Sequence, residues 1–145
     1  MKIVAKNRRA RFDYDILDTV EAGMILTGPE VKSCRNGNVN LSGAYVSILG
    51  EKAFLKKAKI ARYQYASDPH YDPERDRELL LKKAEARRLM SKRAEKGIAV
   101  IPLEVRAGRF IKVLLGLARG RKKHDKRQRT REREVERRLR RGFER

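Results

Sequence analysis

The C-terminal end of this 145-residue chain is too polar to form a folded core, and it therefore limits where a domain can lie. Residues 120–145 contain 13 Lys or Arg and 5 Asp or Glu, and their only sizeable apolar side chains are Val135, Leu139 and Phe143. These three are four residues apart, so on a helix they would form one narrow stripe that cannot bury a core. We expect this basic tail to be disordered alone and to fold only on a polyanionic partner. The folded domain is predicted to occupy residues 1–119.

The net charge indicates what kind of partner the chain has. It is +19 at pH 7, of which the tail supplies +8, so the body is basic as well. Charge of this sign and size in a small protein is typical of nucleic-acid binding. The sequence contains no long apolar segment, no signal peptide and no amphipathic helix with a broad apolar face. We therefore expect a cytoplasmic protein that binds no membrane, and we expect a monomer.

Alternating polar and apolar residues predict about six short strands. The predicted strands lie at residues 13–20, 24–26, 44–49 and 53–60, followed by a final hairpin of 98–106 with 109–118. Strands joined mainly by hairpins indicate a mainly β fold with some helix. We predict an oligonucleotide-binding-type antiparallel Greek-key barrel, closed or nearly closed, with flanking helices.

Two helices are predicted between these strands. Thr27-Gly28-Pro29-Glu30 is typical of a capping box with proline in the first turn, and Asn36-Gly37 ends this short helix. Asp72-Pro73 opens a longer predicted helix over residues 73–96, closed by Gly97. On a helical wheel its apolar residues share one side, and Leu80 lies at the edge of that stripe, where we expect partial exposure.

The sequence offers no arrangement for catalysis or metal binding. Its single cysteine, Cys34, and its two histidines, His70 and His124, cannot supply the four ligands of a structural zinc site. His124 with Asp125 has the residue types of an acid–base pair, but a general base must be held rigidly near its target, and the tail provides no such support. We therefore predict no enzyme, no metal and no cofactor. His124 is interpreted either as a solvated polar residue or as a ring on which an RNA base stacks.

Three features of the body are candidates for RNA contact, each with a simpler alternative. The basic block around Arg8, Arg9 and Arg11 is either a contact surface or a frayed, solvated terminus. Glu21 is either a turn residue or an acceptor for base N–H groups or a ribose 2′-OH. Leu80 is a candidate for stacking on a base.

Taken in order, several short motifs of this chain resemble those of the SmpB (small protein B) family. They are Asn7-Arg8-Arg9-Ala10-Arg11, Glu21-Ala22-Gly23, Glu30-Val31-Lys32-Ser33, Val39-Asn40-Leu41, Asp72-Pro73, Leu79-Leu80-Leu81, and Ala118-Arg119-Gly120 through Lys122-Lys123-His124-Asp125-Lys126-Arg127. The family's usual leucine after Glu-Val-Lys-Ser is Cys34 here, a smaller apolar residue that should still pack. The ordered set, more than any single motif, carries the resemblance.

The resemblance implies an oligonucleotide-binding-type barrel that binds the transfer-RNA-like part of transfer-messenger RNA (SsrA RNA). By similarity Asn7, Glu21 and Leu80 make this contact, and we add the neighbouring Arg8, Arg9 and Arg11 to the predicted RNA-binding residues. Tyr14 and Tyr45 match further recurrent positions of the family's barrel.

The resemblance also implies rescue of ribosomes stalled on messages that lack a stop codon, in company with elongation factor Tu carrying the charged RNA. The tail would fold as a helix in the ribosome, reading the decoding centre and the empty message channel. The matching tail residues are Gly120, Lys122, Lys123, His124, Asp125, Lys126 and Arg127; contacts beyond Arg129 are not carried over. The alternative is a ribosomal protein whose basic tail threads ribosomal RNA.

Overall fold

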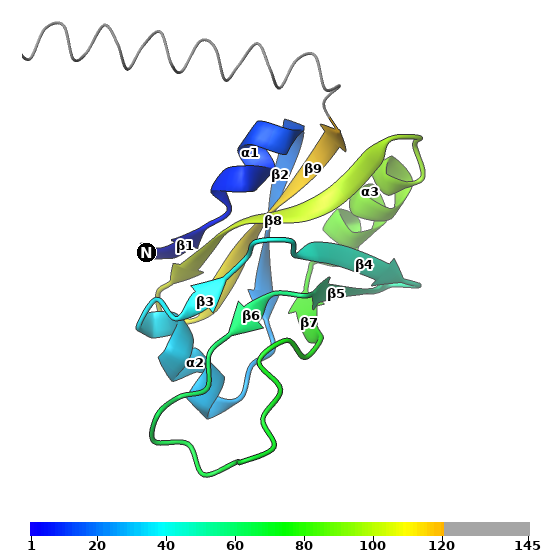
Figure 1. Ribbon diagram of the computed structural model, residues 1–145. Coiled ribbons are helices and arrows are strands. Elements are labelled where there is room, and N and C mark those ends of the chain that lie inside the picture. The colour runs from blue at the N-terminus through cyan, green and yellow to red at the C-terminus, as the bar shows by residue number, and fades with distance from the viewer. Residues whose placement is uncertain (121–145) are drawn as a thin grey trace, which may run out of the picture.

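The computed structural model describes residues 1–120, which form nine strands and three helices (Figure 1). The tail residues predicted to read the decoding centre, Lys122 to Arg127, lie outside the described residues. The strands are β1 (Lys2–Lys6), β2 (Tyr14–Met24), β3 (Val39–Asn40), β4 (Tyr45–Leu49), β5 (Lys52–Lys56), β6 (Lys59–Ile60), β7 (Arg77–Leu80), β8 (Ile98–Ala107) and β9 (Ile111–Gly120). The helices are α1 (Arg8–Asp13), α2 (Gly28–Arg35) and α3 (Lys83–Arg93).

Seven of the strands form one antiparallel sheet in the order β1-β8-β9-β2-β7-β5-β4, and β3 pairs separately with β6. The long β8–β9 hairpin lies between β1 and β2, so the topology is not a simple meander. The predicted mainly β, antiparallel fold with flanking helices is confirmed. The sheet is open, however, because its two end strands, β1 and β4, do not pair with each other.

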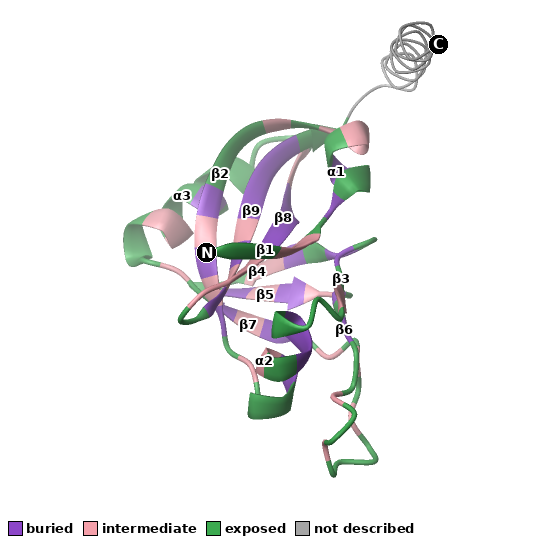
Figure 2. Ribbon diagram, turned by 90° about the vertical axis from the view of Figure 1, so that its left-hand side faces the viewer, coloured by how far each residue is buried: buried purple, intermediate pink, exposed green. Residues whose placement is uncertain are grey.

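The larger core cluster lies on one side of the central strands, which Figure 2 shows as largely buried, and a smaller cluster of Ala10, Ile101, Leu103 and Ala118 packs on their other side against α1. Along β2, Val20, Ala22 and Met24 are buried, while the residues between them face outward. The predicted final hairpin is confirmed as β8 and β9, in which Val105 pairs with Val113 and both are fully buried. Period-two alternation thus directs one set of side chains into the larger core, whereas the opposite face is apolar beneath α1 and polar around Glu21 and Lys112.

The N-terminal residues are ordered, and their interpretation as a frayed terminus is wrong. Strand β1 pairs with β8 from Lys2 opposite Ala107 to Lys6 opposite Glu104. Asn7 then caps α1 by accepting a hydrogen bond from the Ala10 N–H. Residues 2–6 are too few to form a stable strand alone, and their pairing with the long strand β8 at the edge of the sheet holds them in place.

Strand β2 is longer than predicted and has no turn at Glu21-Ala22-Gly23. It pairs with β9 from Tyr14 opposite Gly120 to Gly23 opposite Lys112, with one irregularity between Ile16 and Asp18. The continuous ladder of β9 overrides the local turn tendency of the glycine.

The predicted helix over residues 73–96 is wrong in its first half. Residues 77–80 form strand β7 between β2 and β5, and α3 begins only at Lys83. Leu79 is buried in the sheet, whereas Leu89 is the buried residue of α3. The spacing of the apolar residues in this segment is compatible with a helix or with a strand. The strand is favoured because it buries Arg77 beside Glu30.

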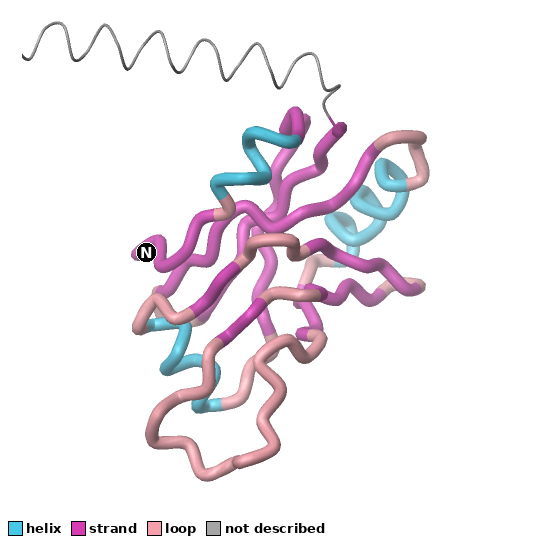
Figure 3. The backbone as a smooth tube through the Cα atoms, viewed as in Figure 1, coloured by secondary structure: helices cyan, strands magenta, loops and turns pink. Residues whose placement is uncertain are grey.

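Helix α2 forms as predicted. The Thr27 hydroxyl oxygen accepts from the Glu30 N–H at 3.4 Å, and the Glu30 carboxylate accepts from the Thr27 N–H at 3.0 Å. Cys34 is fully buried and packs as a small apolar side chain. After β6 the chain runs through the long loop that Figure 3 shows beside α2, at the opposite end of the molecule from α1 and the end of β9.

Candidate nucleic-acid interface

A band of alternating charges crosses the outer face of the sheet from α1 over β8 and β9 to β2. Arg106 lies at its centre, with Nε 3.0 Å from Glu104 and Nη1 3.1 Å from Glu21. The other Glu21 oxygen lies 3.2 Å from Nζ of Lys112, and Arg11 lies 3.9 Å from Glu104. We call these five residues the charged band. It carries three cations and two carboxylates, which are half-buried or better except at Arg11.

Leu80 lies next to this band with 58% of its surface exposed. Gly23 stands opposite Lys112 on one side and opposite Leu80 on the other, so the three form a row across β9, β2 and β7. Gly23 shares the outer face with Glu21, two residues earlier on the strand. Since Gly23 has no side chain, the flank of Leu80 stays open, and an added Cβ would lie 3.5 Å from Leu80 Cβ. The structure thus brings Glu21 and Leu80 to one face.

Electrostatics keep the band charged. The hydrogen bond from Lys112 has the largest effect and lowers the pKa of Glu21. Burial opposes it, and the charge of Lys112 together with the ion pair to Arg106 adds to the lowering. The hydrogen bond to Glu104 likewise raises the pKa of Arg106. An ionised carboxylate offers about four lone-pair sites, so Glu21 keeps acceptor capacity beyond its two cations.

Asn7 is placed by packing. Its side chain is buried, its Nδ2 donates to the Pro102 carbonyl at 2.9 Å, and its backbone N–H donates to the Leu103 carbonyl at 2.7 Å. These bonds fix α1 on β8. Asn7 also lines an open hollow of about 590 Å³ together with Tyr14 and Tyr45.

The three predicted arginines all lie on α1. Arg8 is exposed, Arg9 pairs with Asp13 at 3.2 Å, and Arg11 joins the charged band. Because Tyr14, directly after α1, pairs with Gly120, this helix stands beside the point where the tail begins. Gly120 itself ends β9, and among the described residues none other than its chain neighbour lies within 4 Å of where its Cβ would be.

A buried ionic cluster around Glu30 was not predicted beyond its capping role. Glu30 and Arg77 are almost completely buried, and both Nε and Nη2 of Arg77 donate to the same Glu30 oxygen, at 3.1 and 2.8 Å. Arg75 also pairs with Glu30, and the Tyr71 hydroxyl lies 3.0 Å from it. No local signal in the sequence could reveal partners 41 to 47 residues away. The cluster ties the 61–76 loop and the start of β7 to α2, and so positions Leu80.

The cluster also sets the ionisation of its members. Burial alone would raise the pKa of Glu30, but hydrogen bonds from Arg75, the Thr27 N–H and Arg77 outweigh it and lower the pKa to about 2. Burial, with the nearby charge of Glu30, raises the pKa of Tyr71 and of Cys34 to about 12. The Cys34 thiol is therefore protonated and unreactive at neutral pH.

We expect the protein to lose stability in acid through Glu30. Its pKa is lower in the folded state than its usual 4.5, so its contribution is complete above that value and is lost as the pH falls from 4.5 toward 2. The shift corresponds to about 3 kcal/mol. Urea unfolding of the wild type and of Glu30→Gln at a series of pH values measures it. The free energies of the two proteins should converge below pH 4.5, and parallel curves would contradict the assignment.

Within residues 1–120, no three or more His, Cys, Asp and Glu side chains are grouped so as to hold a metal ion. None of the helices in this part of the chain has the length and apolar character needed to span a membrane.

The fold and this face define a small, strongly basic β-sheet protein of the nucleic-acid-binding class. The family model described as SmpB protein matches residues 4–145. The SsrA-binding protein of Anaeromyxobacter sp. (strain K) is 48% identical over 147 residues, covering 97% of this chain and 90% of the relative. That of Lactobacillus helveticus (strain DPC 4571) is 45% identical over 142 residues, covering 97% and 93%. The chain therefore belongs to the SmpB family.

A solved structure is similar as well. It is described as "tmRNA-SmpB: a journey to the center of the bacterial ribosome", and it has a TM-score of 0.71 and 42% sequence identity. The similarity covers 89% of this chain and 94% of that chain.

Proposed function

We propose that this chain binds transfer-messenger RNA and acts with it on stalled ribosomes in trans-translation. The observation that carries the proposal is the exposed Leu80 beside the ionised Glu21 on a sheet face where cations outnumber carboxylates by three to two. Relatives of this chain are named SsrA-binding proteins, and the similar solved structure is a tmRNA–SmpB complex on the bacterial ribosome. Both support this function.

The three kinds of side chain on this face have complementary tasks. Arg106 and Lys112 can bind phosphates, which fixes the register of an RNA without reading its bases. Leu80 offers an apolar surface against which a base or ribose can pack. Glu21 can accept a hydrogen bond from a base N–H or a ribose 2′-OH, which no cation can do. The face is therefore suited to recognise one particular folded RNA, and not merely to attract polyanions through its charge.

We extend the proposal to the rest of the chain. The basic arginines of α1 would continue the RNA surface, with Asn7 holding that helix in place. The tail from Gly120 would enter the decoding centre, and elongation factor Tu would join through the charged RNA. The role is binding and delivery by a cytoplasmic monomer, with no catalytic step on this chain.

The alternative is a ribosomal protein with a tail that threads ribosomal RNA. Sequencing the RNA that copurifies with the protein separates the two. One dominant small RNA supports transfer-messenger RNA binding, whereas stoichiometric ribosomal RNA from all subunits would support the alternative.

We predict that Glu21→Ala weakens binding of transfer-messenger RNA by about tenfold, or about 1.4 kcal/mol. The substitution removes a negative charge and the Glu21 ion pairs of Lys112 and Arg106, of which Arg106 keeps its pair with Glu104, so a purely electrostatic surface would bind more tightly. Weaker binding therefore requires a specific contact of the carboxylate. Binding is measured at physiological salt with the purified RNA.

The matched control is Glu51→Ala, which makes the same charge change at an exposed turn residue between β4 and β5. It should leave affinity unchanged or slightly raised. If Glu21→Ala behaves in the same way, the specific contact does not exist. Thermal unfolding checks that both variants keep their fold.

A further inference from the structure

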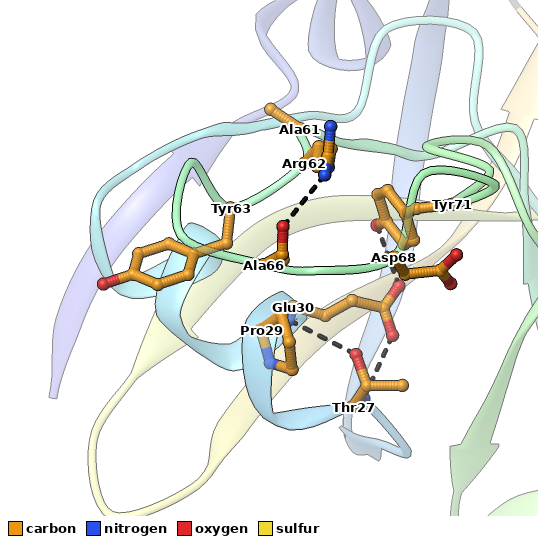
Figure 4. Close-up of a pocket in the computed structure, with 9 residues that line it drawn as sticks. All are labelled: Thr27, Pro29, Glu30, Ala61, Arg62, Tyr63, Ala66, Asp68 and Tyr71. Carbon is orange, nitrogen blue, oxygen red and sulfur yellow. Dashed lines mark hydrogen bonds between the residues drawn. The ribbon is translucent and has the colours of Figure 1, made fainter.

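A second candidate RNA site lies in a pocket between the start of α2 and the 61–76 loop (Figure 4). Its volume is about 190 Å³, well below the roughly 300–1,000 Å³ of sites for drug-sized ligands. Tyr63 and Tyr71 stand on opposite sides of it in the figure, and Pro29 and Glu30 form its floor. The space suits a single planar ring.

The pocket is formed in the free protein, because hydrogen bonds hold both of its walls. The Tyr71 hydroxyl lies 3.0 Å from Glu30 and 2.9 Å from the Ile60 carbonyl. Arg62 donates to the Ala66 carbonyl at 2.9 Å and so closes the turn that carries Tyr63. The charge of Glu30 on the floor is offset by Arg75 and Arg77, so it does not repel an anionic ligand.

The surroundings of the pocket favour a nucleotide over a protein side chain. Nζ of Lys32 lies 5.3 Å from the ring centroid of Tyr63, and Arg62 lines the pocket, so two cations are available for a phosphate. Tyr63 supplies an aromatic face, the surface on which unpaired RNA bases stack. Asp68 lines the pocket and can accept a base N–H.

We propose that this pocket binds one unpaired nucleobase of the RNA partner, with its phosphate held by Lys32 and Arg62. The inference rests on the proposed function for the identity of that RNA. The site differs from the Glu21–Leu80 face, since it shares no residue with that face and lies between α2 and the 61–76 loop (Figure 4). The RNA would then be held at two separate places on the body.

The first test uses the full-length protein and the four nucleoside monophosphates, AMP, GMP, CMP and UMP, in an amide NMR titration. At least one of them should shift resonances of the 61–76 loop and the start of α2. Ala66→Phe, which fills the pocket, should abolish these shifts. No shifts in this region, or equal shifts with ribose 5-phosphate, would overturn the proposal. Occupation by N-acetyltyrosine amide but by no nucleotide would assign the pocket to a protein partner.

The second test measures affinity for transfer-messenger RNA. Tyr63→Ala should weaken it by about tenfold, the usual effect of removing one stacking ring. Phe110→Ala is the matched control, because Phe110 is an aromatic residue of the β8–β9 turn that is 64% exposed and lies outside the pocket. Tyr65 is unsuitable, because its ring packs edge-on against Tyr63 with 5.4 Å between the ring centroids. Equal losses in the two variants would overturn the inference.

The two proposals can fail separately. If Tyr63→Ala binds normally while Glu21→Ala does not, the pocket proposal alone is wrong. If nucleotides fill the pocket but transfer-messenger RNA is not bound, the proposed function is wrong and the base site stands. Thermal unfolding of Tyr63→Ala and Ala66→Phe shows whether either loss comes from misfolding.

Discussion

Arg77→Ala should destabilise the protein by about 3–5 kcal/mol, the usual effect of removing one partner of a buried ion pair. Both Arg77 and Glu30 are almost completely buried, so the substitution would leave the Glu30 carboxylate short of the partner that offsets its desolvation. It would also remove donors from the Ala58 carbonyl at 2.7 Å and the Pro73 carbonyl at 3.0 Å. Since small domains have only about 5–15 kcal/mol of stability, a large part of the total is at risk.

Urea unfolding followed by circular dichroism measures this loss. Arg75→Ala is the matched control, because Arg75 pairs with the same carboxylate but is about one third exposed. Water can replace its guanidinium, so we expect a clearly smaller loss. Equal losses would mean that burial of Arg77 is not what matters. Replacing both buried charges, as in Glu30→Gln with Arg77→Met, should cost less than the sum of the single changes.

The elements that the sequence predicted correctly are those that local interactions determine. Helix α2 is encoded by Thr27 and Glu30, whose capping bonds span three residues. The β8–β9 hairpin is encoded by alternation within two adjacent runs. Strand β7 was mistaken for helix because its start depends on Arg77 reaching Glu30, 47 residues earlier in the chain. Contacts of that length leave no periodic signal.

The candidate site divides in the same way. Glu21 stood out in the sequence as an acid on a basic body, but its partner Arg106 lies 85 residues away and could not be anticipated. Leu80, a candidate for partial exposure in the sequence, is exposed, but it lies on a strand beside Gly23 and not at the edge of a helical stripe. The buried anchor of Asn7 on Pro102 shows a structural role that the motif alone did not reveal. The sequence shows which residue types suit RNA binding. Their arrangement on one face depends on the register of the strands, which the sequence alone does not reveal.

Truncation after Gly120 should leave transfer-messenger RNA affinity nearly unchanged and abolish peptide tagging on stalled ribosomes. Gly120 completes β9 opposite Tyr14, so a chain ending there keeps every described strand. The truncated chain also keeps all residues of the Glu21–Leu80 face and of the pocket between α2 and the 61–76 loop. The deleted segment removes a charge of +8, so some weakening is expected at low salt, and affinity is therefore compared at physiological ionic strength.

The tail's contribution can be divided by sequence. A chain that ends after Arg129 keeps Lys122 to Arg127 and loses most of the distal arginines. If specificity resides in residues 122–127, the shortened chain should support weak but measurable peptide tagging. The double substitution His124→Ala with Asp125→Ala in the full-length protein retains nearly all of the charge, but it should support far less tagging than the wild type. An affinity loss on full truncation as severe as the tagging loss would show that body and tail bind the same RNA together. That result would replace the separation of a folded RNA-binding body from a ribosome-reading tail with a single continuous binding surface.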